Sequence, residues 1–217
     1  MAVKPRRYHS PARTAAALET RSRIVAAARD LFVENGYPAT TIAAIASRAE
    51  VAPDTVYATF GGKLAVLKAT MDVVVGGDER DVKVLDRTGP QAMRAETDQR
   101  RQIAMFAAGL TQQLERIAPV DAILRGAAAV DPGAAELRTD LQQRQRRAAM
   151  QASVSWIAAN GPLRKGLTEE DAAAVVWTLT SPEVHAMFRD SWGWNAARFE
   201  SWLRNALLDG LLPPSAG

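Results

Sequence analysis

Few side chains in this 217-residue sequence are of the kinds that perform catalysis or bind metals. The chain has no cysteine, which excludes a thiolate nucleophile and a thiolate metal site. Its two histidines, His9 and His185, do not form a pair at metal-binding spacing, and no Ser/His/Asp arrangement or glycine-rich phosphate loop is present. Asp171, Glu183 and Glu200 are better explained by helix starts and surface positions than by a metal site. We therefore expect no enzymatic activity, no metal and no cofactor.

The stretch from Thr41 to Lys63 resembles a binding surface more than a catalytic centre. Apolar residues recur in it at intervals of three and four, which predicts two short helices joined by a tight turn. Thr41 can cap the first helix, and Pro53 suits the first turn of the second because its missing N–H would have had no partner there. The outer surface of the second helix is small and uncharged, and its shape suits a groove about 12 Å wide. That surface consists of Ala52, Pro53, Thr55, Tyr57, Ala58 and Thr59.

A longer set of residue types at fixed spacing runs through the same stretch. It comprises Gly36-Tyr37, Thr40-Thr41-Ile42, Ile45-Ala46, Ala49, Val51, Thr55-Val56-Tyr57, Phe60 and Lys63. This set resembles the N-terminal DNA-binding domain of the TetR family of transcriptional regulators, over roughly residues 18 to 75. The resemblance implies an all-α fold with an N-terminal three-helix helix-turn-helix domain. A C-terminal helical bundle for ligand binding and dimerisation would follow.

The resemblance also implies which residues contact DNA. The expected set is Thr41, Ala43, Pro53, Thr55, Tyr57, Thr59 and Lys63. Thr41, Tyr57 and Lys63 would hold phosphates, which position a protein without specifying sequence. Pro53, Thr55 and Thr59 would face base edges. Since the second helix offers no Arg, Lys, Asn or Gln, readout should depend on threonines, thymine methyl contacts and DNA shape.

Five positions depart from the family pattern, and two of them are Gly62, in place of the usual Ser or Asp cap, and Leu64, in place of a usual acidic residue. Glu50 stands where family members commonly carry glycine, and a positive φ there would cost a non-glycine residue on the order of 1 kcal/mol. Either the turn is strained or its geometry differs. Ala44 replaces the acidic residue of a capping box, and Thr59 replaces a common aromatic residue or histidine.

Length and charge indicate two domains with the positive charge near the N-terminus. We expect an arm at 1–17, a helix-turn-helix domain at 18–62 and a helical ligand-binding and dimerisation domain at 63–217. The arm is basic and lacks a helical period, so it should be flexible, and Lys4, Arg6 and Arg7 could reach a minor groove. Up to Lys63 the chain has an excess of basic residues, as steering toward DNA needs. No apolar run is long enough to span a membrane and the arm lacks a secretory signal, so we expect a cytoplasmic protein with no membrane partner.

The second domain offers candidate residues for a ligand pocket and a dimer interface. The pocket candidates are Met105, Phe106, Leu110, Trp156 and Trp177, with plain core packing as the alternative. His185 could be a polar anchor in a pocket or a structural histidine. The phrases TSPEVHAMF and GWNAARFESWL resemble the region in which two helices from each subunit form a four-helix dimer interface in many family members. The interface candidates are Val175, Leu179, Phe199, Trp202, Leu203 and Ala206.

Taken together, the sequence predicts a homodimeric TetR-like transcriptional regulator. It would be a repressor that leaves an approximately palindromic operator in double-stranded DNA when a small-molecule effector binds. The alanine-rich second domain suggests an uncharged or lipophilic effector. The alternatives are a helical ligand-binding or interaction protein with a degenerate DNA-binding head, an all-α enzyme, an activator, and a regulator that works without ligand.

Overall fold

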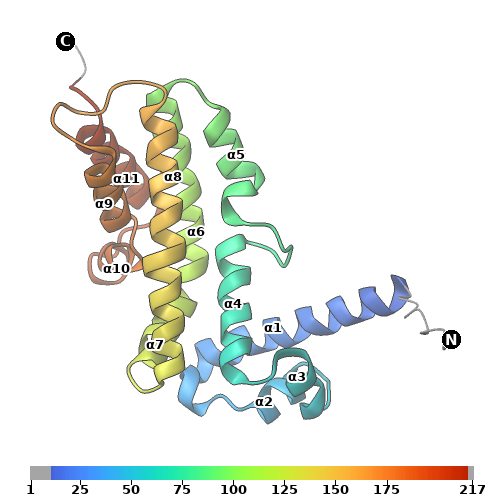
Figure 1. The fold of residues 1–217 in the computed structure, drawn as a ribbon. Helices are drawn as coiled ribbons and strands as arrows, with labels where there is room; N and C mark the ends of the chain where they lie inside the picture. The colour runs from blue at the N-terminus through green and yellow to red at the C-terminus, as the bar shows by residue number, and fades with distance from the viewer. Residues whose placement is uncertain (1–10, 215–217) are drawn as a thin grey trace. The chain divides into compact units, whose positions relative to one another are not determined.

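A computed structural model describes residues 11–214, which fold into helices and connecting turns without any strand (Figure 1). The chain divides into two compact units, the first ending at Thr70 and the second beginning at Met71. This division falls inside helix α4 (Lys63–Gly76), eight residues after the boundary expected from the sequence. Within residues 11–214 no helix is both long and apolar enough to cross a membrane.

The first unit consists of α1 (Pro11–Ala39), α2 (Ile42–Arg48), α3 (Pro53–Phe60) and the first part of α4. Helix α1 begins at Pro11, so the expectation that the arm lacks a helix as far as residue 17 is wrong from residue 11 on. Lys4, Arg6 and Arg7 lie outside the described residues. The core of the unit is made of apolar side chains at helical spacing, with Ile24, Phe32, Ile45 and Val56 fully buried.

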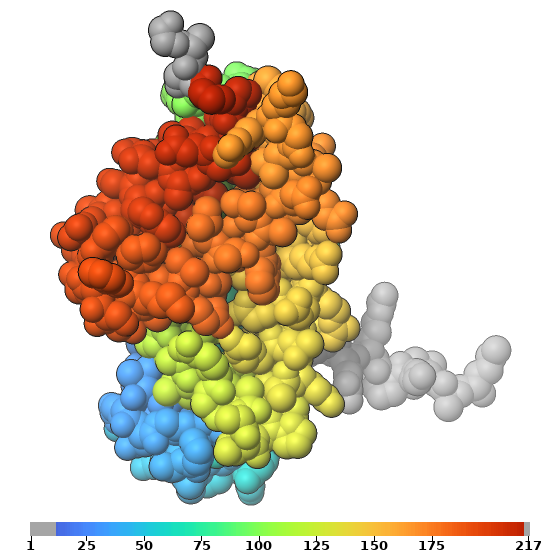
Figure 2. Space-filling model, turned by 90° about the vertical axis from the view of Figure 1, so that its left-hand side faces the viewer, coloured from blue at the N-terminus to red at the C-terminus, as the bar shows by residue number. Residues whose placement is uncertain are grey.

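The second unit is a helical bundle (Figure 1). Its elements are η1 (Val84–Asp86), α5 (Thr88–Ala95), α6 (Gln99–Ala128), α7 (Pro132–Thr139), η2 (Asp140–Arg146), α8 (Arg147–Ala158), α9 (Glu169–Leu179), α10 (Pro182–Ala186), η3 (Met187–Ser191) and α11 (Ala196–Leu211). η1 is a 3₁₀ turn, whereas η2 and η3 are π-helical. Helix α6 packs against α7, α10 and α11, and α8 packs against α9. Figure 2 shows the C-terminal helices, orange to red, beside the yellow segment of α7 and α8.

Helix α6 contains an internal proline. A proline commonly ends a helix, but α6 continues through Pro119 to Ala128. A break lies earlier, at residues 96–98, where the Asp98 carboxylate accepts the N–H of Arg101 (2.8 Å) and caps the start of α6. A proline costs a helix one internal hydrogen bond, and packing of α6 along its whole length against its neighbours offsets that loss.

The core of the second unit includes two residues that were expected in a dimer interface. Phe199 and Leu203 on α11 are both 0% exposed and belong to a cluster with Ile103, Phe106 and Leu114 of α6. A partner subunit could not touch side chains that this chain already encloses. The prediction of an interface role is therefore wrong for Phe199 and Leu203, which hold α11 to the bundle instead.

Candidate functional site

The turn between α2 and α3 is a helix C-cap built on Glu50. The N–H of Val51 donates to Ala46 O (3.0 Å) and the N–H of Glu50 donates to Ser47 O (3.2 Å), the paired bonds of a Schellman motif. Glu50 has a φ of 54°, which is the left-handed conformation that this motif normally gives to glycine. Of the two alternatives left by the sequence, the strained turn is the one found. Glu50 thus holds a conformation that favours glycine.

A second corner joins α1 to α2 and involves Lys63. Gly36, with a φ of 74°, breaks α1 there, and the hydroxyl of Thr40 donates to Gly36 O (2.8 Å) and Leu31 O (3.1 Å). The ammonium group of Lys63 donates to Tyr37 O (2.7 Å) and Thr40 O (2.9 Å) and lies 4.3 Å from the centroid of the Tyr37 ring. Lys63 thus stabilises free carbonyl groups at a helix end, a role that cations fill well. Its expected phosphate contact stays a prediction, and its ammonium group has these partners within the chain.

The other expected DNA contacts form the outer face of α3 and the start of α2. Thr41, Ala43, Pro53, Tyr57 and Thr59 are exposed, and Thr55 is half-buried. The Tyr57 side chain is 53% exposed, so its hydroxyl can reach a ligand outside the domain. The Thr41 hydroxyl accepts the N–H of Ala44 (3.1 Å), which caps α2, and the Thr59 hydroxyl donates to Thr55 O (2.7 Å). These positions present hydroxyl and apolar groups at the same surface, as the sequence suggested.

Two arginines near this surface support the domain. Arg48 on α2 makes two parallel bonds to the Glu34 carboxylate on α1, at 2.8 and 2.9 Å. This hydrogen bonding lowers the pKa of Glu34 below its ordinary value, so the pair stays charged at neutral pH. The guanidinium group of Arg21 lies 4.6 Å from the centroid of the Phe60 ring and covers the end of α3. Both arginines therefore fix the position of the α2–α3 pair on α1.

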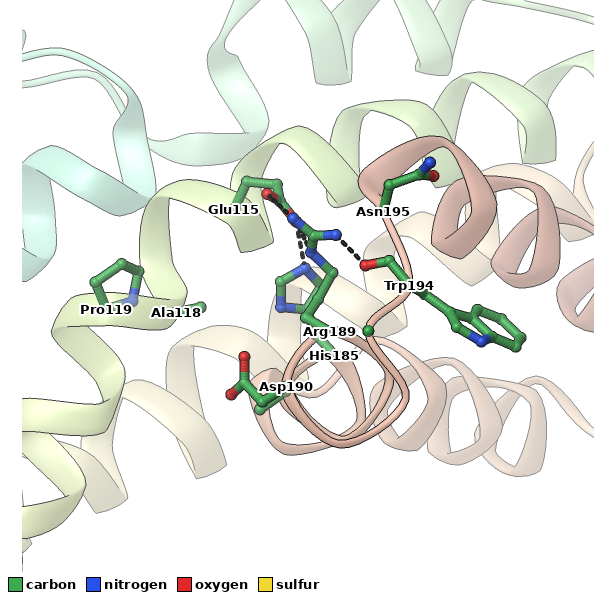
Figure 3. A pocket seen from close by; sticks show the side chains of 10 residues that line it. Glu115, Ala118, Pro119, His185, Arg189, Asp190, Trp194 and Asn195 are labelled. Atoms are coloured by element: carbon green, nitrogen blue, oxygen red, sulfur yellow. Dashed lines mark hydrogen bonds and ion pairs between the residues drawn. The ribbon is translucent and has the colours of Figure 1, made fainter.

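The second unit contains a polar cavity of about 380 Å³ between α6 and the α10–η3 turn (Figure 3). Its central group is the Glu115 carboxylate, which lies 2.8 Å from His185 Nε2 and receives Arg189 through Nε (2.8 Å) and Nη2 (3.1 Å). Arg189 also donates to the carbonyl of Trp194. His185 is only 2% exposed and its ring meets Phe199 edge-on at 4.9 Å. These contacts tie α6, α10 and the segment before α11 together.

A buried charged cluster lies further along α6 and α10. Asp121 is 1% exposed, and neither of its carboxylate oxygens has a hydrogen-bond partner within the described chain. Burial, and next the charge of Glu183, raise the pKa of Asp121 above its ordinary value. Arg146 donates to Thr180 Oγ1 (3.0 Å) and to the carbonyl of Trp177, and burial lowers its pKa to about 10. Within residues 11–214 no three His, Asp or Glu side chains are placed to hold a metal ion.

Comparison with known proteins assigns the first unit. The model of the family described as "Bacterial regulatory proteins, tetR family" matches residues 24–70, which span α1 from Ile24 to the middle of α4. The chain carries a TetR-family domain. The strained turn, the α3 surface and the Lys63 contacts all fall inside that match. The family resemblance read from the sequence is thereby confirmed.

A curated relative agrees with the assignment of this domain. An uncharacterized HTH-type transcriptional regulator, TtgW of Pseudomonas putida, is 48% identical over 57 residues, which are 26% of this chain and 42% of TtgW. The match thus spans less than half of that relative's length.

Solved structures extend the likeness to the whole fold. The structure of NalD, the secondary repressor of the MexAB-OprM multidrug efflux pump in Pseudomonas aeruginosa, has a TM-score of 0.66 at 19% identity, over 91% of this chain and 99% of that one. A SmeT–triclosan complex has a TM-score of 0.64 at 19% identity, over 90% and 93%. At these identities the likeness shows the fold alone. The expected all-α fold with an N-terminal helix-turn-helix and a C-terminal helical domain is confirmed.

The structure does not gather the five expected pocket residues around the cavity between α6 and the α10–η3 turn. Phe106 is buried in the core cluster, while Leu110, Trp156 and Trp177 pack against that cluster. Met105 is 38% exposed on α6. The core-packing alternative describes the buried members better. Sequence reasoning singled out His185 but missed Glu115, which also lines the cavity. The two residues are 70 positions apart, so no local pattern links them.

The remaining interface candidates lie on α9 and α11. Val175, Leu179, Trp202 and Ala206 are all half-buried in the single chain, so each leaves some apolar surface uncovered. Their role in a dimer stays a prediction.

Proposed function

We propose that this chain binds operator DNA as a homodimer and regulates transcription. The observation that supports this most is the exposed face of α3, held by a left-handed turn inside a TetR-family domain. The side chains on that face are small, so the helix can lie close to base edges. The function is one of binding, without a catalytic step.

The proposed contacts divide into two kinds. Thr41, Tyr57 and the α2 N-terminus would hold phosphates, whereas Pro53, Thr55 and Thr59 would lie at base edges. Two copies of α3 in a dimer would enter successive major grooves about 34–36 Å apart, so the operator should be an approximate inverted repeat. Dimerisation would use the uncovered apolar surface of α9 and α11. The chain would work in the cytoplasm, where its DNA is.

We further propose that the chain is a repressor that a small molecule releases from DNA. NalD is named as a repressor and SmeT as a complex with triclosan, and both share this fold. Helix α4 is the covalent link between the two units, so it is the element through which a change in the second unit would reach α3. An effector can shift the equilibrium between the DNA-binding and the released conformation only by the difference between its affinities for the two conformations.

Fluorescence anisotropy with DNA from upstream of this gene would test the proposal. Purified protein should sediment as a dimer and bind an inverted repeat from that DNA more tightly than a shuffled duplex at moderate salt. Its affinity should fall steeply as salt increases, because bound phosphates release their counterions. A monomer, or equal affinity for both duplexes, would contradict the proposal and favour a ligand-binding protein with a degenerate head.

A further inference from the structure

The cavity between α6 and the α10–η3 turn has the size of a small-molecule site. Its volume of about 380 Å³ lies in the lower part of the range of roughly 300–1,000 Å³ that such sites span. Ala118, Pro119 and Ala186 supply apolar wall. Part of the wall comes from η3, and π-helical turns occur frequently at functional sites.

Two of the charged groups in this wall neutralise each other. The Arg189 guanidinium forms a two-bond pair with the Glu115 carboxylate, at 2.8 and 3.1 Å, and a third bond to the carbonyl of Trp194. The Glu115 carboxylate accepts His185 Nε2 as well. Neither Glu115 nor Arg189 therefore has its charge available for a ligand.

His185 supplies a hydrogen-bond acceptor that nothing in the described chain uses. An ionised carboxylate only accepts, so the Nε2 atom facing Glu115 must carry the proton. In the neutral ring Nδ1 is then an acceptor. This atom is buried and has no partner among residues 11–214. Figure 3 shows His185 between Glu115 and the side of the cavity where Ala118 and Asp190 lie.

Asp190 supplies the second unused acceptor. Its carboxylate is exposed at the cavity wall and makes no hydrogen bond or ion pair with the described part of the chain. Asn195, next to it in the wall, uses its carbonyl oxygen to accept the N–H of Arg198 (2.9 Å). The side chains still available in the wall thus include two acceptors, one of them negatively charged.

We propose that this cavity binds a small organic cation. Its ammonium group would pair with Asp190, a second N–H would donate to His185 Nδ1, and its apolar body would lie against Ala118, Pro119 and Ala186. An anion is disfavoured, because Arg189, the one Lys or Arg among the described wall residues, is already paired while Asp190 is not. The inference deepens the proposed function by naming an effector class, which is cationic and not the uncharged class suggested by composition.

Isothermal titration calorimetry on the full chain would test this with phenethylamine and tryptamine as cationic probes and 2-phenylethanol as the neutral one. The amines should bind the unaltered chain more tightly than the alcohol. Asp190→Asn should weaken amine binding about five- to tenfold, the size of a charged hydrogen bond at a partly exposed site, and leave the alcohol unchanged. Asp209→Asn, which alters an exposed carboxylate on α11 outside the cavity, should leave both unchanged.

Three results would overturn the inference: no amine binding at millimolar concentration, equal binding of amines and alcohol, or no effect of Asp190→Asn. DNA release, measured by anisotropy in parallel, separates this inference from the proposed function. Amine binding with the expected pattern but without DNA release would keep the cavity site and reject effector release. If one neutral compound released both the unaltered chain and Asp190→Asn from DNA, effector release would be kept and this cavity would be rejected as the effector site.

Discussion

Replacing Glu50 by glycine should stabilise the N-terminal unit by about 1 kcal/mol. A left-handed residue such as Glu50, at φ 54°, costs an L-amino acid roughly 1–2 kcal/mol, and glycine adopts the conformation without that cost. The carboxylate also lies at the C-terminal end of α2, where a negative charge is unfavourable by about 0.3 kcal/mol at an exposed site. Against this, glycine increases the conformational entropy of the unfolded chain, which lowers the free energy of unfolding by about 0.4–1 kcal/mol.

The Glu50→Gly substitution removes no stabilising side-chain contact of note. The Glu50 side chain is exposed, and the backbone bond from its N–H to Ser47 O (3.2 Å) is one that glycine keeps. Glu50→Ala is the matched control, since it removes the charge but keeps Cβ and hence the strain. Alanine should therefore change the stability by only a few tenths of a kcal/mol, about the size of the dipole contribution.

Urea unfolding followed by circular dichroism gives the free energy of unfolding of each variant. For a chain of this size, 1 kcal/mol corresponds to a shift in Tm of about 2–4 °C. Hydrogen exchange of the α2 and α3 amides reports the first unit separately from the second. If Glu50→Gly were no more stable than Glu50→Ala, the reasoning from the left-handed turn would be refuted.

Three further predictions concern Lys63, Tyr57 and Asp121. Lys63→Met should lower the stability of the first unit by about 1–2 kcal/mol, because the carbonyls of two residues lose a charged donor. If Lys63 also contacts a phosphate, as the sequence predicts, the slope of DNA affinity against salt concentration should become smaller by about 0.9 in this variant. An unchanged slope would contradict the phosphate contact. Tyr57→Phe keeps the exposed ring, so urea unfolding should be unaltered while anisotropy shows weaker binding to operator and shuffled DNA alike. The pKa of Asp121 is raised in the folded chain, so the free energy of unfolding should fall as the pH rises from the ordinary pKa of an aspartate through the raised value. Asp121→Asn should remove this fall and should be more stable than the unaltered chain at pH 7. Urea unfolding at a series of pH values would measure both effects.

The helix-turn-helix could be predicted because its signals are local. The spacing of Ile42, Ile45 and Val56, and Pro53 at a helix start, reflect one or two helical turns each, and the structure places them accordingly. The left-handed conformation of Glu50 could be raised as an alternative only by comparing residue types with a family pattern.

The second unit was harder to predict because its decisive contacts join distant residues. His185 is buried against Glu115 and Phe199, neither of which its own neighbours in the sequence reveal. Phe199 has the helical spacing of an interface residue as much as that of a core residue, and only the packing of α11 on α6 decides. Pro119 is tolerated inside α6 for the same reason.

The π-helical turn η3 affects how this chain should be aligned with homologues. A π turn closes over five residues instead of four, as the bond from the Trp192 N–H to Met187 O (3.2 Å) shows, so it holds one residue more than an α turn. A homologue with an ordinary helix there would have one residue fewer between His185 and Trp194. An alignment that forbids gaps inside helices would then pair Arg189 and Asp190 with the wrong positions. Counting residues between that histidine and that tryptophan is thus a simple way to sort homologues by whether they can form the same cavity wall.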